Sequence, residues 1–211
     1  KYGTAILGQF KKLGISVDWS RTRYTRDKQY EKAVLQAFNI YHKKGWIYKG
    51  YRVINWCIRC GTGISDLEVN YVPEKGKLYY IKYGPFTLAT TRPETKFGDT
   101  GLAVHPNDKR YKDYVGKDLE IESVDNSVLA DKPPKIKKIK IRVVTDKAVD
   151  REFGTGIIKV TPAHDLIDFE ISQRHNLPLV KIIDERGKIN QNAGVRYENL
   201  KVAEAREKIT K

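Results

Sequence analysis

The sequence predicts an α+β fold in which a β-barrel-like sheet carries a small number of helices. This prediction rests on a change in the spacing of apolar residues along the chain. Up to about residue 50 they recur at helical spacing, whereas from Tyr51 onward short runs alternate with a period of two. Many short strands with few helices are typical of barrel-like sheets that are decorated by helices.

Residues 1–50 are expected to form a helical segment. The first apolar series stops at Gly14, and its members are Ala5, Ile6, Phe10 and Leu13. A second helix is expected from about Asp27 to Lys44, because Gly45 provides its stop. The apolar stripe of this helix, which we interpret as core, consists of Tyr30, Val34, Phe38 and Tyr41.

The remainder of the chain is expected to consist mainly of strands. The candidate strands are residues 78–83, 86–91, 101–105, 139–144, 157–161 and 178–183. Gly84-Pro85 predicts a turn between the first two. One helix is expected from about His164 to His175, and another begins near Val202. The expected segments are therefore a helical part (1–50), a Cys-x-x-Cys region with stalk strands (51–75), the main domain (76–200) and the start of an exit helix (201–211).

Composition excludes several classes of protein. Of 211 residues, 40% are hydrophobic and 10% aromatic, which is too apolar for a disordered chain. No apolar run approaches the roughly 18 residues of a spanning helix, and the N-terminus lacks a signal-peptide pattern. Two cysteines do not make a disulfide framework, so we expect a cytoplasmic protein. Because Met is absent even from position 1, we expect a piece of a longer chain.

The charge balance points to a polyanionic partner. Lys+Arg number 40 against 26 Asp+Glu, a net charge of +14, for which solubility is the simplest explanation and nucleic-acid binding the more specific one. The densest basic run extends from Lys132 to Lys140. Ile139 and Ile141 then alternate with basic residues, which predicts a basic loop leading into a strand with one face in water.

Cys57 and Cys60 are separated by two residues and followed by a glycine. Two thiolates at this spacing form half of a tetrahedral zinc knuckle, which needs four ligands. No second cysteine pair is present, and nothing in the spacing of His42 or His105 favours either as a further ligand. The alternatives are a redox pair and two inert thiols.

A hydroxyl-rich cluster follows one strand candidate, at Ala89-Thr90-Thr91-Arg92-Pro93-Glu94-Thr95. Hydroxyl groups at a strand end can bind an ester or amino group, and Arg92 can hold a phosphate or carboxylate. The residues alone favour the simpler alternative, which is a polar turn begun by Pro93 with a threonine as a helix cap.

Two carboxylates open the helix that follows the strand at 157–161. Asp165 and Asp168 lie three residues apart, so they share one helical face. They complement the helix dipole, and they also flank the end of a strand whose Lys159 and Thr161 point the same way. Such a site suits an ammonium group and a hydroxyl.

His164, next to Asp165, is a candidate general base, although a single histidine at such a turn is more often structural. The chain has no nucleophile motif, so we expect chemistry done by water or by the substrate.

Taken in order, the motifs resemble the connective insertion that carries the editing domain of class I aminoacyl-tRNA synthetases, and the valyl branch matches best. The matching segments are Phe10-Lys-Lys-Leu-Gly14, Asp18-Trp-Ser20, Asn55-Trp-Cys-Ile-Arg-Cys-Gly-Thr62, Ala89-Thr-Thr-Arg-Pro-Glu-Thr95, Gly98-Asp-Thr100 and Phe153-Gly-Thr-Gly156 through Phe169. Ile58 departs from the family, which usually has Pro there. The resemblance implies the barrel-like editing fold shared with the leucyl and isoleucyl enzymes.

The resemblance implies hydrolysis of threonine mis-attached to the 3′ end of the valine tRNA, with threonyl-adenylate as a second candidate substrate. Asp168, helped by Lys159, would bind the threonine hydroxyl, and Asp165 would bind the α-ammonium group. Arg92 and three threonines would hold the ester, adenosine or water. The residues expected to be catalytic are Arg92, Thr95 and Asp165. Those expected to bind substrate are Thr90, Thr91, Lys159, Thr161, His164 and Asp168.

The parent synthetase would ligate valine to its tRNA with ATP, but this chain has no His-x-Gly-His pair and no Met for the second activation motif. We therefore expect deacylation without aminoacylation. Editing is expected to need no cofactor. Cys57 and Cys60 would bind zinc only with ligands from outside the chain. The expected partners are the valine tRNA and the rest of the synthetase, with no membrane.

Three alternatives remain open at this point. One is an editing domain of leucyl or isoleucyl specificity. Another is a basic RNA-binding module with a zinc knuckle and no catalysis, which leaves the paired carboxylates unexplained. The third is a free-standing deacylase, which the absence of Met and the helical N-terminal segment disfavour.

Overall fold

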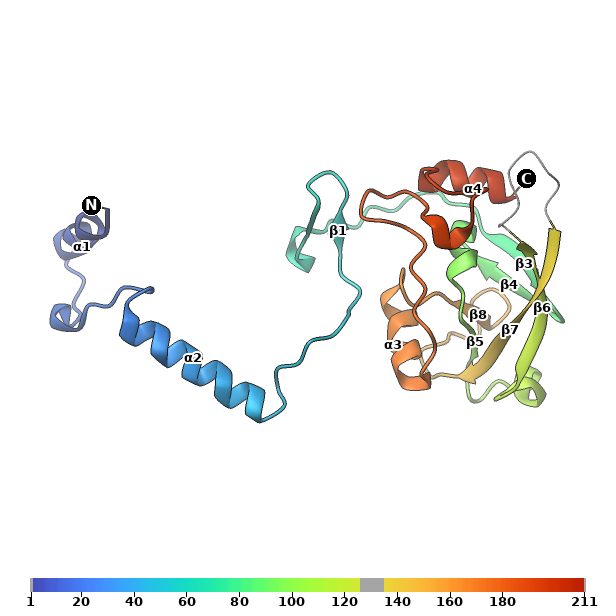
Figure 1. Cartoon of the computed structure of the whole chain (residues 1–211), viewed down its shortest axis with the longest axis horizontal. Coiled ribbons are helices and arrows are strands. Elements are labelled where there is room, and N and C mark those ends of the chain that lie inside the picture. The colour runs from blue at the N-terminus through green and yellow to red at the C-terminus, as the bar shows by residue number, and fades with distance from the viewer. Residues whose placement is uncertain (1, 126–134, 211) are drawn as a thin grey trace. The chain divides into compact units, whose positions relative to one another are not determined.

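The computed structural model describes residues 2–125 and 135–210 (Figure 1). Lys132, with which the dense basic run begins, and the two prolines after it lie outside the described residues. The chain divides into two compact units, Lys1–Tyr51 and Arg52–Lys211. In the described part of the chain, no helix is both long and apolar enough to cross a membrane.

The N-terminal unit is helical, as its sequence predicts. It contains α1 (Tyr2–Lys12), the 3-10 turn η1 (Trp19–Arg21) and α2 (Lys28–Lys43). The Asp27 carboxylate caps α2 by accepting the backbone N–H of Tyr30 at 2.8 Å, and Gly45 follows the helix with φ 72°. No residue of α1 or α2 is buried, so the expected core stripe is solvent-exposed in the described chain.

The second unit begins with a small knuckle. Strands β1 (Trp56–Cys57) and β2 (Thr62–Gly63) pair antiparallel, and η2 (Asp66–Glu68) follows them. The Trp56 indole N–H donates to the carbonyl oxygen of Glu185 at 2.8 Å, so the knuckle contacts the C-terminal part of the same unit.

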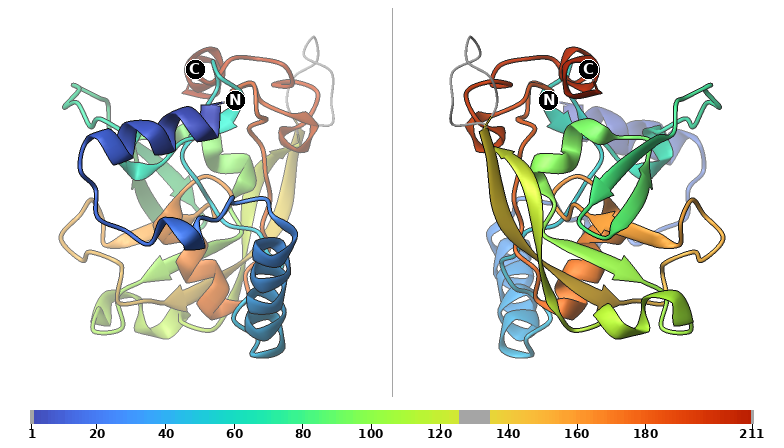
Figure 2. Two further views of the ribbon diagram at one scale, coloured as in Figure 1. Left: turned by 90° about the vertical axis from the view of Figure 1, so that its left-hand side faces the viewer. Right: turned by 90° about the vertical axis from the view of Figure 1, so that its right-hand side faces the viewer.

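Two sheets form the centre of the second unit. A hairpin consists of β3 (Tyr79–Tyr83) and β4 (Phe86–Thr90), which the expected Gly84-Pro85 turn joins. The other sheet is mixed, in the order β6-β7-β5-β8, with β5 (Gly101–Val104) parallel to β7 (Lys135–Thr145). Strands β6 (Asp118–Asp125) and β8 (Ile157–Val160) are antiparallel to their neighbours (Figure 2).

Short helical elements join and cover these strands. They are η3 (Pro93–Gly98), η4 (Lys109–Tyr114), α3 (Leu166–His175), η5 (Gln191–Ala193) and α4 (Val202–Thr210). The expected helices near residues 164–175 and 202 correspond to α3 and α4.

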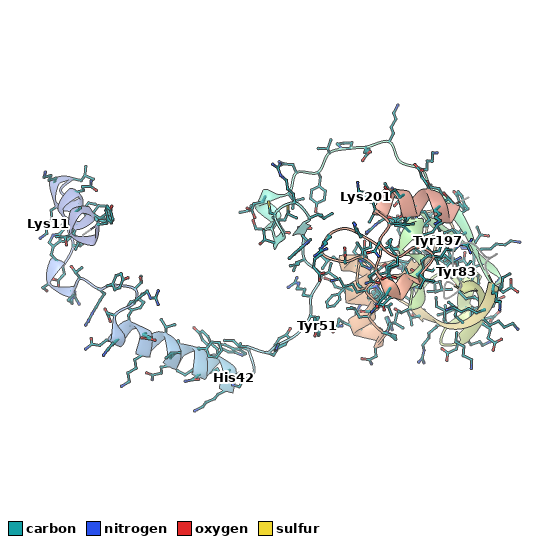
Figure 3. All side chains as sticks on the ribbon, turned by 45° about the horizontal axis from the view of Figure 1, so that its top comes forward. Lys11, His42, Tyr51, Tyr83, Tyr197 and Lys201 are labelled. Atoms are coloured by element: carbon teal, nitrogen blue, oxygen red, sulfur yellow. The ribbon has the colours of Figure 1, made fainter. Side chains whose placement is uncertain are left out.

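Strand β5 is buried on both faces and divides two apolar clusters. Leu102 and Val104 pack into a cluster with Leu88 of the hairpin, whereas Ala103 packs on the opposite face with Ile171 of α3. A third cluster gathers C-terminal residues around Ile182 and Tyr197. Tyr197 is labelled in Figure 3. The hairpin and the mixed sheet therefore share one core although they are separate hydrogen-bonded sheets.

The α+β class is confirmed, but the described strands do not close a barrel, because their hydrogen bonds separate them into distinct sheets. Strand β6 was not predicted, although Leu119 and Ile121 alternate within it. The strand expected at 178–183 is wrong. In the described structure Ile183 makes only an isolated bridge to Ile189, and Ile182 packs into the third cluster from an irregular segment.

The basic strand has the alternation that its sequence predicts. Ile141 and Val143 of β7 are buried, whereas Lys140 and Arg142, on either side of Ile141, are exposed. On β6, Glu120 lies directly opposite Lys140, and its carboxylate is 3.6 Å from the Lys138 ammonium group. Acidic neighbours therefore offset much of the positive charge on this face.

Leu102→Ala should lower the free energy of unfolding by about 2–5 kcal/mol, because the Leu102 side chain is fully buried where the hairpin meets the mixed sheet. Ile136→Ala is the control, since Ile136 is 69% exposed, and it should change stability by less than about 0.5 kcal/mol. Urea denaturation measures both values. Equal losses would contradict a shared core centred on β5.

Candidate active site

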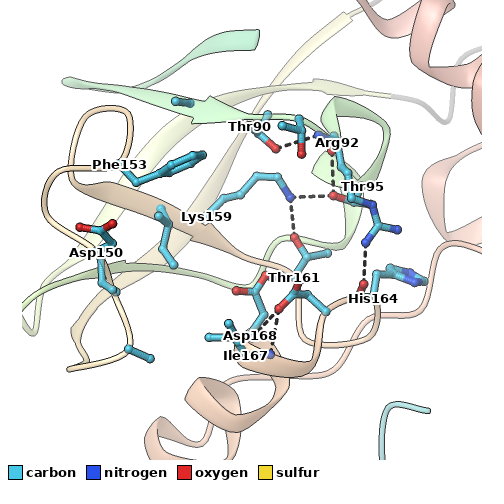
Figure 4. A pocket seen from close by; sticks show the side chains of 16 residues that line it. Thr90, Arg92, Thr95, Asp150, Phe153, Lys159, Thr161, His164, Ile167 and Asp168 are labelled. Atoms are coloured by element: carbon cyan, nitrogen blue, oxygen red, sulfur yellow. Dashed lines mark hydrogen bonds between the residues drawn. The ribbon is translucent and has the colours of Figure 1, made fainter. Parts of the chain in front are cut away.

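A cavity of about 390 Å³ lies where β4, η3, β8 and the start of α3 meet (Figure 4). The structure brings together at this cavity every residue for which the sequence predicts catalysis or substrate binding. These residues are Thr90, Thr91, Arg92, Thr95, Lys159, Thr161, His164, Asp165 and Asp168. Residues 89–95 and residues 158–168, which are far apart in the sequence, therefore form two parts of one cavity wall.

Lys159 is the centre of the hydrogen-bond network beside the cavity. Its Nζ lies 2.7 Å from Oγ1 of Thr95, 2.6 Å from Oγ1 of Thr161 and 3.0 Å from Oδ1 of Asp99. The Lys159 side chain is 9% exposed and that of Asp99 is 2% exposed. Because an ammonium group has three hydrogens, these partners engage all of them.

The lysine sets the direction of both threonine hydroxyls. The Thr161 hydroxyl donates to Oδ1 of Asp99 at 2.6 Å, and that of Thr95 donates to the carbonyl oxygen of Arg92 at 2.9 Å. Each hydroxyl also accepts a hydrogen from Lys159. Since a hydroxyl has one hydrogen and two lone pairs, each keeps one lone pair for a further donor.

The two carboxylates at the start of α3 differ in their surroundings. Asp165 is exposed and caps the helix, because its Oδ1 accepts the backbone N–H groups of Ile167 at 2.9 Å and Asp168 at 3.1 Å. Oδ2 of Asp168 accepts the backbone N–H of Thr161 at 2.8 Å. Burial raises the pKa of Asp168 to about 6, with a smaller contribution from the Asp165 charge.

The His164 ring has a structural hydrogen bond. Its Nε2 accepts the backbone N–H of Ile182 at 2.9 Å, so the neutral ring carries its hydrogen on Nδ1. Burial, followed by the charges of Arg92 and Lys159, lowers the pKa of His164 to about 4. The imidazole is therefore neutral at physiological pH, and the structural alternative for His164 accounts for its Nε2.

Arg92 links the two halves of the cavity wall. Its Nη1 donates to the carbonyl oxygen of His164 at 2.7 Å, and its backbone N–H donates to Oγ1 of Thr90 at 3.1 Å. The Arg92 side chain is 43% exposed, so part of the guanidinium group stays accessible at the cavity. Thr91 is also exposed there.

The set of predicted residues lacks several that the structure places at or behind the cavity. Asp99 accepts from Lys159, Thr161 and the Tyr83 hydroxyl, while Asp150 and Phe153 line the cavity directly. The sequence signal for Asp99 was its place in the Gly98-Asp99-Thr100 segment of the resemblance. Nothing in its spacing indicated Lys159 as its partner.

Cys57 and Cys60 lie in the knuckle, outside the cavity. The Cys60 backbone N–H donates to Sγ of Cys57 at 3.4 Å, which lowers the pKa of the Cys57 thiol. Among the described residues, no group of three or more His, Cys, Asp and Glu side chains could hold a metal ion. The two thiols alone thus do not fit a complete zinc site, and zinc binding stays a prediction that requires further ligands.

The chain is similar to proteins of one known family. Residues 1–194 match the family model described as tRNA synthetases class I (I, L, M and V). The chain is 48% identical to a valine–tRNA ligase of Thermotoga maritima over 100% of its length and 24% of the relative's. For the valine–tRNA ligase of Carboxydothermus hydrogenoformans, the identity is 45%, over 99% of this chain and 23% of the relative. The chain thus spans about a quarter of the length of these relatives.

The raised pKa of Asp168 predicts a pH dependence of stability. Between its usual value of 3.8 and about 6, the folded chain holds a proton that the unfolded chain has lost. This stabilisation is fully present below about pH 4 and is lost as the pH rises through about 6. The free energy of unfolding of the wild type, relative to Asp168→Asn, should therefore fall across this window and stay constant above it.

Denaturation with urea at a series of pH values measures this difference. The lowered pKa of His164 acts in the opposite direction, because its stabilisation is present above pH 6.5 and lost as the pH falls through about 4. Both proteins contain His164, so its contribution cancels. A difference that is independent of pH would show that the Asp168 carboxyl is not buried as described.

Proposed function

This chain belongs to the class I tRNA synthetases, and among them to the valine–tRNA ligases. We propose that its cavity is an editing site, which hydrolyses threonine wrongly esterified to the valine tRNA. A synthetic site that accepts valine cannot strongly reject the isosteric threonine, and valine–tRNA ligases are a standard example of this limit. A second site that recognises the threonine hydroxyl corrects the error.

The observation that carries the proposal is the set of hydrogen-bond acceptors around the cavity. Thr95 Oγ1 and Thr161 Oγ1 each have one lone pair left. Within the described residues, Oδ1 of Asp168 and Oδ2 of Asp165 receive no hydrogen bond. The two carboxylate oxygens match the hydroxyl hydrogen and the ammonium group of a threonyl ligand, and the two hydroxyl lone pairs are left for a hydrogen of the attacking water or the adenosine.

Valine offers only the ammonium hydrogens. Its methyl group would lie against a carboxylate oxygen that loses water without gaining a partner, which is unfavourable. We therefore assign the threonine hydroxyl to Asp168, whose carboxylate is partly buried, and the α-ammonium group to the exposed Asp165. Recognition of a hydroxyl by a desolvated acceptor gives stronger discrimination than a difference in size.

Lys159 has a different role from the one that the sequence suggests. Its ammonium hydrogens are engaged by Thr95, Thr161 and Asp99, so the lysine orients the acceptors and does not itself donate to the threonine hydroxyl. Arg92, partly exposed beside the cavity, suits a phosphate of the tRNA end or the ester carbonyl. The hydroxyls of Thr90, Thr95 and Thr161 hold the ester, the adenosine or the water.

In the proposed reaction, a water oxygen attacks the carbonyl carbon of the ester, and the bond from this carbon to the ribose oxygen breaks. One water proton passes to the ribose oxygen, and the products are threonine and the free tRNA. Threonyl-adenylate carries the same acyl group and is a second candidate substrate. The hydrolysis needs no cofactor.

The relatives' name describes ligation of valine to tRNA, and we assign that activity to the longer protein of which this chain covers the editing part. The rival function, an RNA-binding module without catalysis, draws its support from the net charge of +14. The acidic residues opposite the β7 cations weaken that support, because they offset the charge of the most basic face.

Asp168→Asn should abolish the preference for threonine. The variant keeps an oxygen for the Thr161 backbone N–H but loses the charge that would bind the substrate hydroxyl. Affinity for a non-hydrolysable threonyl-adenosine analogue should fall about tenfold or more, whereas that for the valyl analogue should hardly change. NMR titration above pH 7 measures both. Asp113→Asn, at an exposed position in η4, is the control, and an unchanged preference in Asp168→Asn would refute the assignment.

Asp165 requires a variant that separates its charge from its capping role. Asp165→Ser keeps a side-chain oxygen for the N-terminus of α3 but removes the charge, whereas Asp165→Ala loses both and should cost about 1 kcal/mol of stability. Both should lower the deacylation rate of threonyl-tRNA by about 100-fold or more, because the ammonium group loses its charged partner. Wild-type activity in Asp165→Ser would contradict the ammonium assignment.

A further inference from the structure

An ion pair between a buried carboxylate and a partly exposed arginine joins the cavity wall to the last helix. The Glu94 side chain in η3 is 0% exposed, and its carboxylate accepts two hydrogen bonds from Arg206 of α4. Nε of Arg206 lies 2.9 Å from Oε2, and Nη2 lies 2.7 Å from Oε1. Arg206 lies 112 positions after Glu94 in the sequence and does not line the cavity.

Glu94 lies between two cavity residues, Arg92 and Thr95, and the Nε of Arg92 is 3.8 Å from Oε1 of Glu94. The buried carboxylate thus has two cationic neighbours, one that faces the cavity and one from α4. A buried carboxylate needs hydrogen-bond donors, and Arg206 supplies two of them to Glu94. Arg92 is thereby left to donate to the carbonyl oxygen of His164.

Packing from the C-terminal residues holds the rest of η3. The Phe97 ring stacks on Tyr197 with centroids 5.1 Å apart, and both belong to the third apolar cluster, which also contains Ala205 of α4. A Cβ atom at Gly98 would lie 2.9 Å from the carbonyl oxygen of Val180. The segment that carries Arg92 and Thr95 is therefore held in part by residues that do not line the cavity.

We propose that Arg206 acts through Glu94 as a positioning residue, so that helix α4 sets the place of Arg92 and Thr95 in the cavity. This inference rests on the proposed function, because those two residues are assigned there to the ester and the water. The rate of hydrolysis would thereby depend on α4, although this helix does not line the cavity.

The rate of hydrolysis and the preference for threonine depend on different residues of the cavity. Asp168 belongs to α3 and Thr161 directly follows β8, and their hydrogen bonds involve neither Glu94 nor Arg206. Loss of Arg206 should misplace Arg92 and Thr95 while it leaves the acceptor of the threonine hydroxyl in place. The rate of hydrolysis should fall, and the preference for threonine over valine should persist.

The test compares Arg206→Met with Arg110→Met in the full-length protein that carries this chain. Arg110 is a matched control, because its Nε and Nη2 also donate to a buried carboxylate, that of Asp108, and it lines no part of the cavity. Arg206→Met should lower kcat for deacylation of threonyl-tRNA about tenfold with the threonine preference unchanged. Arg110→Met should keep kcat, and Arg206→Lys should restore part of it.

NMR gives a second readout that needs no substrate. In Arg206→Met the backbone amide of Thr95 and the side-chain Nε signal of Arg92 should shift, and in Arg110→Met they should not. Unchanged signals together with unchanged kcat in a folded Arg206→Met protein would overturn the proposal, as would an equal loss of activity in Arg110→Met. If the wild type fails to hydrolyse threonyl-tRNA, the proposed function is wrong, and the NMR comparison still decides whether Arg206 positions η3.

Discussion

The buried ammonium group of Lys159 is the constraint on which the cavity depends. Its side chain and that of Asp99 are almost fully removed from water, and such a pair is stable only when every hydrogen and lone pair finds a partner. The pair therefore requires Thr95 and Thr161 as further acceptors. Asp99 in turn accepts from the Tyr83 hydroxyl, which ties the network to the hairpin.

This arrangement gives the cavity its chemical character. The ammonium group of Lys159 is paired with Asp99 in the cavity wall, so the cavity presents hydroxyl and carboxylate oxygens to a ligand. An acceptor-rich surface of this kind suits a ligand with several N–H and O–H groups, and it penalises one that lacks a hydroxyl. The raised pKa of Asp168 and the lowered pKa of His164 have the same origin, since both groups lose water at the junction of β8 and α3.

The wall of the cavity is built from distant parts of the second unit. Residues 89–95 come from the hairpin side, residues 158–168 from the mixed sheet and α3, and the C-terminal cluster supports η3 from behind. The Glu94–Arg206 pair and the Phe97–Tyr197 stack belong to this support. The knuckle with Cys57 and Cys60 lies apart from the cavity and has no part in the proposed chemistry.

Local patterns in the sequence determined much of the architecture. The change from helical to alternating spacing predicted α2, the Gly84-Pro85 hairpin and the strands that became β5 and β8, because each pattern is complete within a few residues. The two carboxylates at the start of α3 were predicted for the same reason, and the ordered motifs of the family resemblance indicated which residues line the cavity. Strand β6 was not predicted, and residues 178–183 were wrongly predicted to form a strand. In both segments the apolar residues pack against residues that are distant in the sequence, so the local pattern did not decide the backbone structure.

Only the tertiary structure decided how the polar groups share their hydrogen bonds. The family resemblance implied that Lys159 helps to bind the substrate hydroxyl, and the structure shows its three hydrogens engaged by Thr95, Thr161 and Asp99. The sequence made His164 a candidate general base, with a structural role as the alternative. In the structure, Nε2 of His164 accepts the backbone N–H of Ile182. Partners such as Glu94 and Arg206, 112 positions apart, leave no local signal, because a hydrogen bond depends on distance in space and not on separation along the chain.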